Sequence, residues 1–253
     1  SEIMYHPPDF GTNSPDNEEF IELFNLSSTN VSLFDPAHAT NVWRLANAVN
    51  FNFATNQTIA ANARLLVVGF NPTNTALLNA FRARYGTNST IVGPYSGNLD
   101  NAGETLELWR PDAPQIAPHP DAGFVPQLLV ERVTYSDLSP WPTNADGFGA
   151  SLQRITAAHY GNDPVNWRAS VPTAGAANIT APTGTATLPG GGIVRLTFTV
   201  QPGLNCQVEF KNNLTNAFWQ PLGVPIVATN TMLIVDDSLT AQPQRFYRLN
   251  IVP

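Results

Sequence analysis

The feature that most constrains the fold of this chain is a recurring pattern of short apolar runs that end at Gly, Pro or Asn. The stretch Gly93–Arg110, GPYSGNLDNAGETLELWR, shows the pattern best. A Gly/Pro/Asn-rich bend comes first, and apolar Leu106 and Leu108 then alternate with polar Glu107. Period-two alternation after a glycine turn is typical of a half-buried β-strand. Repeated along a chain, this pattern predicts β-sheets.

Two further runs and one helical segment complete the fold prediction. EEFIELFNL, Glu18–Leu26, alternates strongly, and the continuous apolar run within Ala61–Phe70 predicts a strand buried on both faces. The 22 prolines and 17 glycines suit many short strands joined by turns. A helix is predicted over Thr75–Tyr85, because Asn74 can cap its start and Gly86 can end it. The sequence therefore predicts an all-β fold with one inserted helix.

A change in composition predicts where the chain divides. VPTAGAANITAPTGTATLP, Val171–Pro189, is small, polar and almost free of bulky apolar side chains, as linkers are. We therefore predict a first β-sandwich over residues 1–178, a linker over 179–189 and a small C-terminal β-sandwich over 190–253. Five strands are predicted in the last part: Ile193–Val200, Cys206–Lys211, Pro221–Val224, Thr231–Val235 and Phe246–Ile251.

Charge and cysteine content exclude several classes of partner. A net charge of −7, with Lys211 as the only lysine, argues against nucleic acid, since phosphate binding needs a basic face. No apolar run approaches the roughly 20 residues of a membrane span, so no membrane insertion is expected. Cys206 is the sole cysteine, which rules out an intramolecular disulfide. Its strand-like surroundings, NCQVEF, predict a buried and inert thiol.

An ordered set of segments resembles a known family. The segments are EIMYHPP, EFIELFN, GPYSGNLDNAGETLELW, VERVTYSDLSPWPTNADGFGASLQRI and DPVNWRAS, in that order within residues 1–178. Together they resemble bacterial lamin-tail domains, which are immunoglobulin-like β-sandwiches. The segment Ala113–Gln127 departs from the family by lengthening a hairpin that is usually tight. The later segments VEFKNNLTNAFWQPLG and DDSLTAQPQRFYRL resemble a short C-terminal β-module of secreted proteins from Verrucomicrobia and related bacteria.

The resemblance implies a function without catalysis. Lamin-tail domains are interaction modules, and in bacteria they are appended to large exported proteins. It follows that this chain is expected to be a segment of a secreted or cell-surface protein that mediates adhesion, scaffolding or assembly. The expected partner is a protein or a surface polysaccharide, and self-association through edge strands is open as well. Any catalytic domain is expected upstream of Ser1.

The residues themselves show no catalytic pattern. The four histidines lack the paired spacing of zinc sites, and no serine lies in a GxSxG motif. Glu18, Glu19 and Glu22 share one strand and are interpreted as solvated charges, with one ion pair to an arginine. A carboxylate pair across a cleft, as in a glycosidase, is the alternative. We therefore expect no enzyme activity from this chain.

Two weaker candidate sites remain. Asp100 and Glu104 lie in an oxygen-rich turn, and calcium binds carboxylate and backbone oxygens, so a structural Ca²⁺ is a hypothesis there. Trp141, Trp109 and Tyr95 could form a sugar-binding platform beside the abundant asparagines. That would make the chain a carbohydrate-binding accessory module of a larger extracellular enzyme, whereas packing in the core is the competing interpretation. Further aromatic candidates are Trp219 and Phe148 for the platform, with Trp43 and Trp167 expected in the core.

Overall fold

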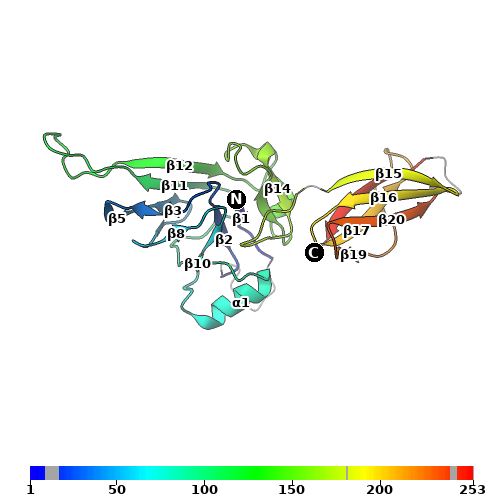
Figure 1. The fold of residues 1–253 in the computed structure, drawn as a ribbon, viewed down its shortest axis with the longest axis horizontal. Coiled ribbons are helices and arrows are strands. Elements are labelled where there is room, and N and C mark those ends of the chain that lie inside the picture. The colour runs from blue at the N-terminus through cyan, green and yellow to red at the C-terminus, as the bar shows by residue number, and fades with distance from the viewer. Residues whose placement is uncertain (9–16, 181, 240–243, 253) are drawn as a thin grey trace. The chain divides into compact units, whose positions relative to one another are not determined.

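The computed structural model describes residues 1–8, 17–180, 182–239 and 244–252. The chain divides into two compact units, Ser1–Asn178 and Ile179–Pro253. Strands dominate both, and the described residues contain one α-helix (Figure 1). The predicted fold class, an all-β sandwich fold with one inserted helix and a second small β unit, is confirmed.

The first unit is built on a six-stranded sheet. Its strands follow the order β10-β9-β2-β1-β13-β14, and all neighbours are antiparallel except β10 and β9. In that order the strands span Ile91–Val92, Arg64–Val68, Phe20–Phe24, Glu2–Met4, Ser151–Arg154 and Trp167–Ser170.

A four-stranded antiparallel sheet forms the second layer, in the order β12-β11-β6-β7. These strands span Gln127–Thr134, Thr105–Pro111, Arg44–Asn47 and Phe51–Asn52. Two short ribbons lie beside it, one of β3 and β8, the other of β4 and β5. The ribbon strands span Val31–Ser32, Thr58–Ile59, Phe34–Asp35 and His38–Val42.

Alternation along the strands gives the first unit two cores. On β2, Ile21 belongs to the cluster between the two sheets, whereas Phe20 belongs to a cluster on the opposite face. Both side chains are almost fully buried. Strand β2 is therefore covered on both faces. Its neighbour β9 is also buried on both faces, which explains its continuous run of apolar residues.

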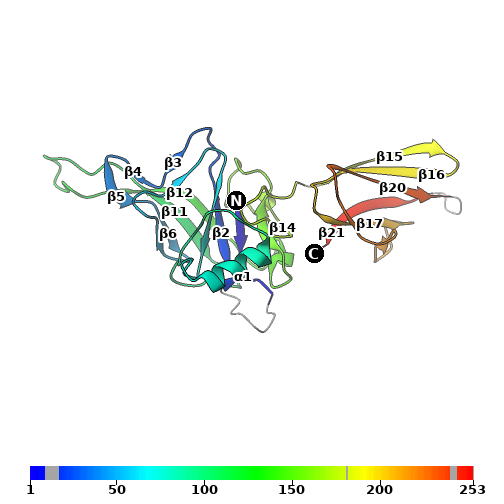
Figure 2. The ribbon, with the colours of Figure 1, turned by 60° about the horizontal axis from the view of Figure 1, so that its bottom comes forward.

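Helix α1, Thr75–Tyr85, covers the second of these cores (Figure 2). Phe81 packs edge-on against Phe20, with ring centroids 6.0 Å apart. The Asn74 side chain accepts hydrogen bonds from the backbone N–H groups of Ala76 and Leu77, and Gly86 ends the helix with φ +62°. Both boundaries are those predicted, because capping chemistry is local. Two 3₁₀ turns, η2 (Thr143–Ala145) and η3 (Pro164–Asn166), lie in later loops.

The second unit contains two small antiparallel sheets. One has the order β15-β16-β20, and in the other β17 pairs with β18, β19 and β21. Its own core, which includes Val194, Leu196 and Val208, also buries Cys206. The prediction of a buried thiol is confirmed. The strands β15 to β21 span Thr183–Gly190, Ile193–Thr199, Asn205–Lys211, Gln220–Pro221, Ile226–Val227, Met232–Ser238 and Phe246–Val252.

The linker predicted over residues 179–189 is corrected by the structure. Thr183–Gly190 forms β15, which pairs along β16 from Thr183↔Thr199 onward. All eight residues of β15 are exposed. Backbone hydrogen bonds hold this edge strand without bulky apolar side chains, so its composition resembles that of a linker.

Among the described residues, no helix combines the length and apolar character needed to cross a membrane.

Candidate functional site

The Asp100–Glu104 turn uses its carboxylates to close itself. Asp100 Oδ1 accepts a hydrogen bond from Ala102 N at 2.8 Å, and Glu104 Oε1 accepts one from Asp100 N at 2.7 Å. The Tyr135 hydroxyl donates to the Asp100 carbonyl at 3.0 Å. Across the described ranges, no three His, Cys, Asp or Glu residues lie close enough to hold a metal. The two carboxylates therefore hold the turn together through hydrogen bonds within the chain.

The predicted aromatic platform is not formed. Trp141 is 7% exposed and packs against Trp167, and Tyr95 is 4% exposed and donates its hydroxyl to Glu19 at 2.9 Å. Trp109 is half-buried on the outer face of β11, where its Nε1 donates to Glu107 at 2.9 Å. Burial of the large aromatic surfaces explains the first two positions. The core interpretation is confirmed for Trp141 and Tyr95, whereas Trp109 is only partly buried.

The remaining aromatic candidates lie apart from these. Phe148 is 79% exposed in the first unit. Trp219 is half-buried in the second unit, with Lys211 Nζ 5.1 Å and the Arg248 guanidinium 4.6 Å from its ring centre. Two cations beside one ring are a cation–π arrangement that stabilises the ring in place.

Two carboxylates face each other inside the first unit: Glu2, which the sequence analysis did not single out, and Glu22, which it placed among solvated charges. Glu2 and Glu22 are register partners on β1 and β2 and are 0% and 1% exposed. Glu2 accepts hydrogen bonds from Ser151 Oγ at 2.5 Å and from Thr173 Oγ1 at 2.7 Å. Burial, together with the nearby Glu22 carboxylate, raises the pKa of Glu2 to about 7.

These carboxylates bind chain segments instead of substrate. Glu22 accepts a hydrogen bond from Gly175 N at 2.7 Å and forms an ion pair with Arg64 at 3.2 Å. Both groups are buried, and their carboxylate oxygens accept hydrogen bonds from other parts of the chain. The prediction of solvated charges holds for neither Glu19 nor Glu22, because both are buried, although an arginine partner for Glu22 is confirmed.

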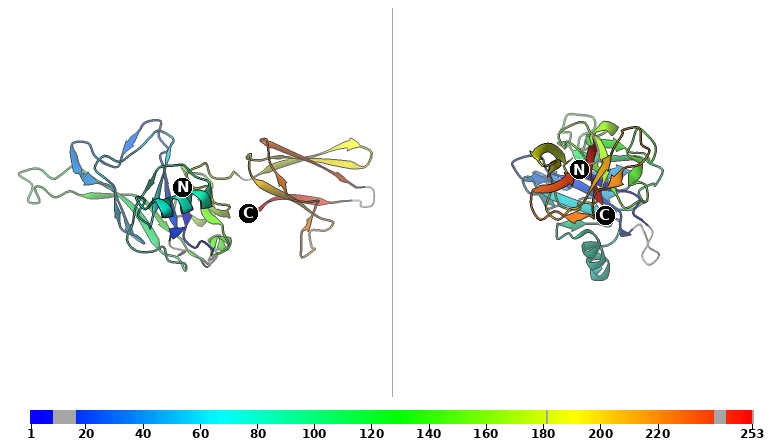
Figure 3. Two further views of the ribbon diagram at one scale, coloured as in Figure 1. Left: turned by 90° about the horizontal axis from the view of Figure 1, so that it is seen from below. Right: turned by 90° about the vertical axis from the view of Figure 1, so that its right-hand side faces the viewer.

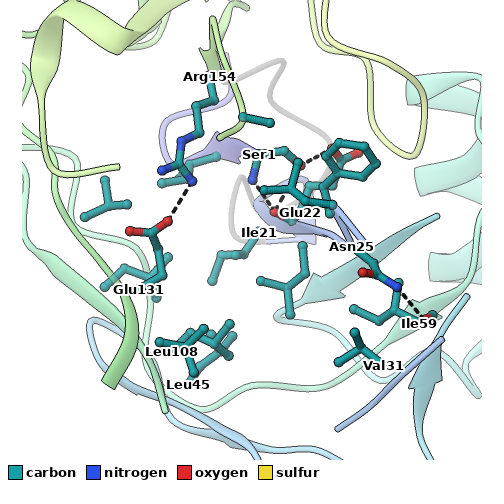
Figure 4. Close-up of a pocket in the computed structure, with 18 of the residues that line it drawn as sticks. Ser1, Ile21, Glu22, Asn25, Val31, Leu45, Ile59, Leu108, Glu131 and Arg154 are labelled. Carbon is teal, nitrogen blue, oxygen red and sulfur yellow. Dashed lines mark hydrogen bonds and ion pairs between the residues drawn. The ribbon is translucent and has the colours of Figure 1, made fainter. Parts of the chain in front are cut away.

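A cavity of about 420 Å³ opens between the two sheets of the first unit (Figure 4). Its walls are mainly aliphatic: Ile3, Ile21 and Leu23 come from the six-stranded sheet, and Leu45, Leu106 and Leu108 come from the four-stranded sheet. Val31 and Ile59 of the β3–β8 ribbon, together with Trp43 and Trp167, extend this wall, and the lining also includes the polar residues Ser1, Glu22 and Asn25. A pocket of this volume with apolar walls lies in the range of small-molecule sites.

One side of the cavity carries an ion pair. Arg154 of β13 donates from Nη1 to Glu131 Oε2 of β12 at 2.7 Å, and Nη2 donates to the carbonyl oxygen of His159. The Arg154 side chain is 10% exposed, and its Nε is buried without a hydrogen-bond partner. Figure 4 shows this pair beside the aliphatic wall that includes Leu108.

A bulge in β12 adds a side chain to the same wall. Leu108 pairs with Glu131 and Trp109 pairs with Leu129, so Val130 is the extra residue of the bulge. Val130 and Glu131 both line the cavity, as does Val133. Bulges redirect side chains and are frequent beside functional sites.

The β11–β12 hairpin also extends into an arm, which projects from the rest of the first unit (Figures 1 and 3). Beyond the strands, Asp112 N donates to Pro126 O and Gln115 N donates to Phe124 O, both at 2.8 Å. Two apolar side chains are exposed in the loop over residues 112–126, which we call the arm tip. Ile116 is 80% exposed and Phe124 is 61% exposed. The exposed apolar side chains of the arm tip therefore lie on a loop whose backbone is held by hydrogen bonds.

The chain matches no known family model, and no curated protein or solved structure shows significant similarity to it. The candidate sites therefore rest on their own geometry.

Proposed function

We propose that this chain is a non-catalytic, protein-binding segment of a secreted or cell-surface bacterial protein, with a lamin-tail-like first unit. The observation that carries the proposal is the arm tip, where Ile116 and Phe124 are exposed on a loop held by backbone hydrogen bonds. Exposed apolar side chains on an extended loop are typical of contact surfaces, because binding a partner removes these side chains from water. The order of the lamin-tail-like segments adds support.

The chemistry of the arm tip favours a protein over a polysaccharide. Sugar sites use flat aromatic rings beside polar groups, whereas the arm tip exposes the branched aliphatic side chain of Ile116 as well as the ring of Phe124, a combination that suits an apolar pocket of a protein. Trp141 and Tyr95, the rings proposed for a sugar platform, are buried. The described geometry thus favours adhesion or scaffolding through protein contacts.

Paired variants in a binding assay test this function. The purified chain is immobilised and exposed to surface proteins from the cells that produce it. We expect a discrete protein to be retained by the wild type and by Phe148→Ser, and its affinity to fall about tenfold or more in the Ile116→Ser/Phe124→Ser double variant. Phe148 is the control because it is similarly exposed, at 79%, but lies outside the arm.

Two results would contradict the proposal. One is retention of the same protein by the double variant with unchanged affinity. The other is enzymatic turnover by the purified chain that is lost when a single acidic residue is replaced.

A further inference from the structure

We infer that the partner of the arm tip is a second copy of this chain, whose cavity receives the side chains of Ile116 and Phe124. The inference rests on the proposed function, because the same arm tip makes the contact, and it adds the identity of the partner. Three observations carry it: the apolar rim of the cavity, the internal bonding of its polar groups, and its match to the arm tip in size and chemistry.

The cavity opens to solvent through an apolar rim. Leu26 and Val130 line the cavity and are 53% and 43% exposed, so apolar surface continues from the outside of the first unit to the aliphatic walls. Exposed apolar surface that leads into a pocket is typical of sites that receive anchor side chains of a partner. This arrangement favours an occupant that presents apolar side chains from outside.

The polar groups of the lining are bonded within the chain. The Ser1 amine donates to the Glu22 carbonyl oxygen at 2.7 Å, and the Ser1 hydroxyl donates to the Glu22 carboxylate at 2.5 Å. Asn25 donates to backbone carbonyl oxygens on the far side of the cavity (Figure 4). Arg154 donates to Glu131, and its Nε is itself buried, so an occupant does not reach it. An occupant therefore gains little from polar atoms of its own.

The charged groups of the lining are paired as well. Glu131 pairs with Arg154 at 2.7 Å, and Glu22 pairs with Arg64 at 3.2 Å. Burial lowers the pKa of the Ser1 amine to about 6, so this amine is mostly uncharged at neutral pH. A charged occupant would lose its hydration without gaining a free counter-charge. Hydrocarbon side chains avoid that cost and suit the cavity best.

The arm tip supplies side chains of this kind and of the right size. Ile116 and Phe124 are hydrocarbon side chains, and both are exposed. An apolar cavity of roughly 150 Å³ can hold benzene. The cavity here measures about 420 Å³, so it can take the ring of Phe124 together with the branched side chain of Ile116.

The arm tip cannot enter the cavity of its own chain. The backbone from Phe124 to Val130 is extended and spans roughly 20 Å, at about 3.3 Å per residue. The arm also projects away from the rest of the first unit (Figure 3). Every copy of the chain carries both the tip and the cavity, so the contact joins two copies. An exposed apolar group that fits a pocket elsewhere on the same molecule leads to assembly in this way.

Mixing of two complementary variants tests the inference. All proteins carry Thr185→Lys, which puts a charge on the exposed strand β15 and opposes pairing through that edge. Ile116→Ser/Phe124→Ser removes the anchor side chains and keeps the cavity. Val130→Trp keeps the arm tip and blocks the cavity, and Leu26→Trp is a second cavity variant. Sedimentation velocity measures the association of each protein alone and of equimolar mixtures.

We expect the Thr185→Lys parent to associate as its concentration rises, and each variant alone to associate about tenfold or more weakly. A mixture of the arm variant with a cavity variant should regain association and stop at two chains, because one intact tip and one intact cavity remain. Its formation also shows that both variants are folded. Leu129→Trp is the control and should associate like the parent, because Leu129 is as exposed as Val130 but does not line the cavity.

A parent protein that stays monomeric would overturn the inference. So would cavity variants that associate like the parent, or mixtures with both cavity variants that associate no better than their components. In these cases, arm-dependent retention of a different protein from the producing cells would still support the proposed function. If the arm tip retained neither a second copy nor another protein, the inference and the proposed function would both fail.

Discussion

Glu2 and Glu22 face each other across the neighbouring strands β1 and β2, and both carboxylates are buried. The pair accepts hydrogen bonds from the backbone N–H groups of Thr173 and Gly175, at 2.9 Å and 2.7 Å. It therefore fastens the last segment of the first unit to the central strands. Since two adjacent negative charges in an apolar interior repel each other, this fastening depends on pH.

The first prediction concerns that pH dependence. The pKa of Glu2 is raised in the folded chain to about 7, from 4.5. Folding therefore favours the protonated form, and the stabilisation is complete below the unfolded pKa and is lost as pH rises through the folded pKa. Relative to Glu2→Gln, the wild type should lose roughly 3 kcal/mol of unfolding free energy between about pH 4 and pH 9. Urea unfolding of both proteins across this range measures the difference, and parallel pH profiles would contradict it.

The second prediction concerns the start of α1. Asn74 Oδ1 accepts from Ala76 N at 3.1 Å and from Leu77 N at 3.3 Å. Asn74→Ala leaves these donors without a side-chain acceptor and should lower the unfolding free energy by about 1 kcal/mol. Asn79→Ala is the control inside the helix and should not destabilise, because alanine has the higher helix propensity. Equal losses of unfolding free energy in the two variants would show that the Asn74 cap does not stabilise the protein.

The third prediction separates core from surface aromatics. Trp141 is 7% exposed and Phe148 is 79% exposed. Trp141→Ala removes a large buried side chain and should cost about 3–5 kcal/mol, whereas Phe148→Ala should stay within about 0.5 kcal/mol of wild type. Thermal or urea unfolding gives both values. An unchanged unfolding free energy for Trp141→Ala would indicate that Trp141 is exposed. That result would contradict the prediction and favour the sugar-binding alternative.

The fourth prediction concerns β15. This fully exposed strand pairs with β16, and within the described residues no other strand pairs with it. An open edge of this length can pair with a second chain, and a lysine on the edge opposes such pairing. We expect light scattering to show concentration-dependent association that Thr185→Lys reduces, while Thr229→Lys in an exposed loop leaves it unchanged. A strictly monomeric wild type would rule out this mode of assembly.

Local chemistry made some of these features predictable from the sequence. Asn74 and Gly86 bound the helix correctly because caps depend on a few neighbouring residues. The strand around Phe20 was equally readable from its alternation. By contrast, β15 carries no bulky apolar alternation, because pairing with β16 holds it, and its sequence therefore resembles a linker.

The candidate sites were harder to predict, since they depend on contacts between distant segments. Glu2 is buried because Ser151 and Thr173, far along the chain, supply its hydrogen bonds. The cavity depends on the spacing of two sheets and on the bulge at Val130. The sequence predicts a lengthened hairpin at Ala113–Gln127. It does not predict that the apolar side chains of this hairpin are exposed, because their exposure depends on the projection of the arm away from the sandwich.

The most direct test of the proposed function is photo-crosslinking at the arm tip. Ile116 is replaced by p-benzoylphenylalanine in the producing cells, with the same replacement at Phe148 as the control. The account predicts one light-dependent crosslinked product of discrete mass, containing a second protein, from position 116 and not from position 148. Uncrosslinked chain alone from position 116, or the same product from both positions, would contradict it.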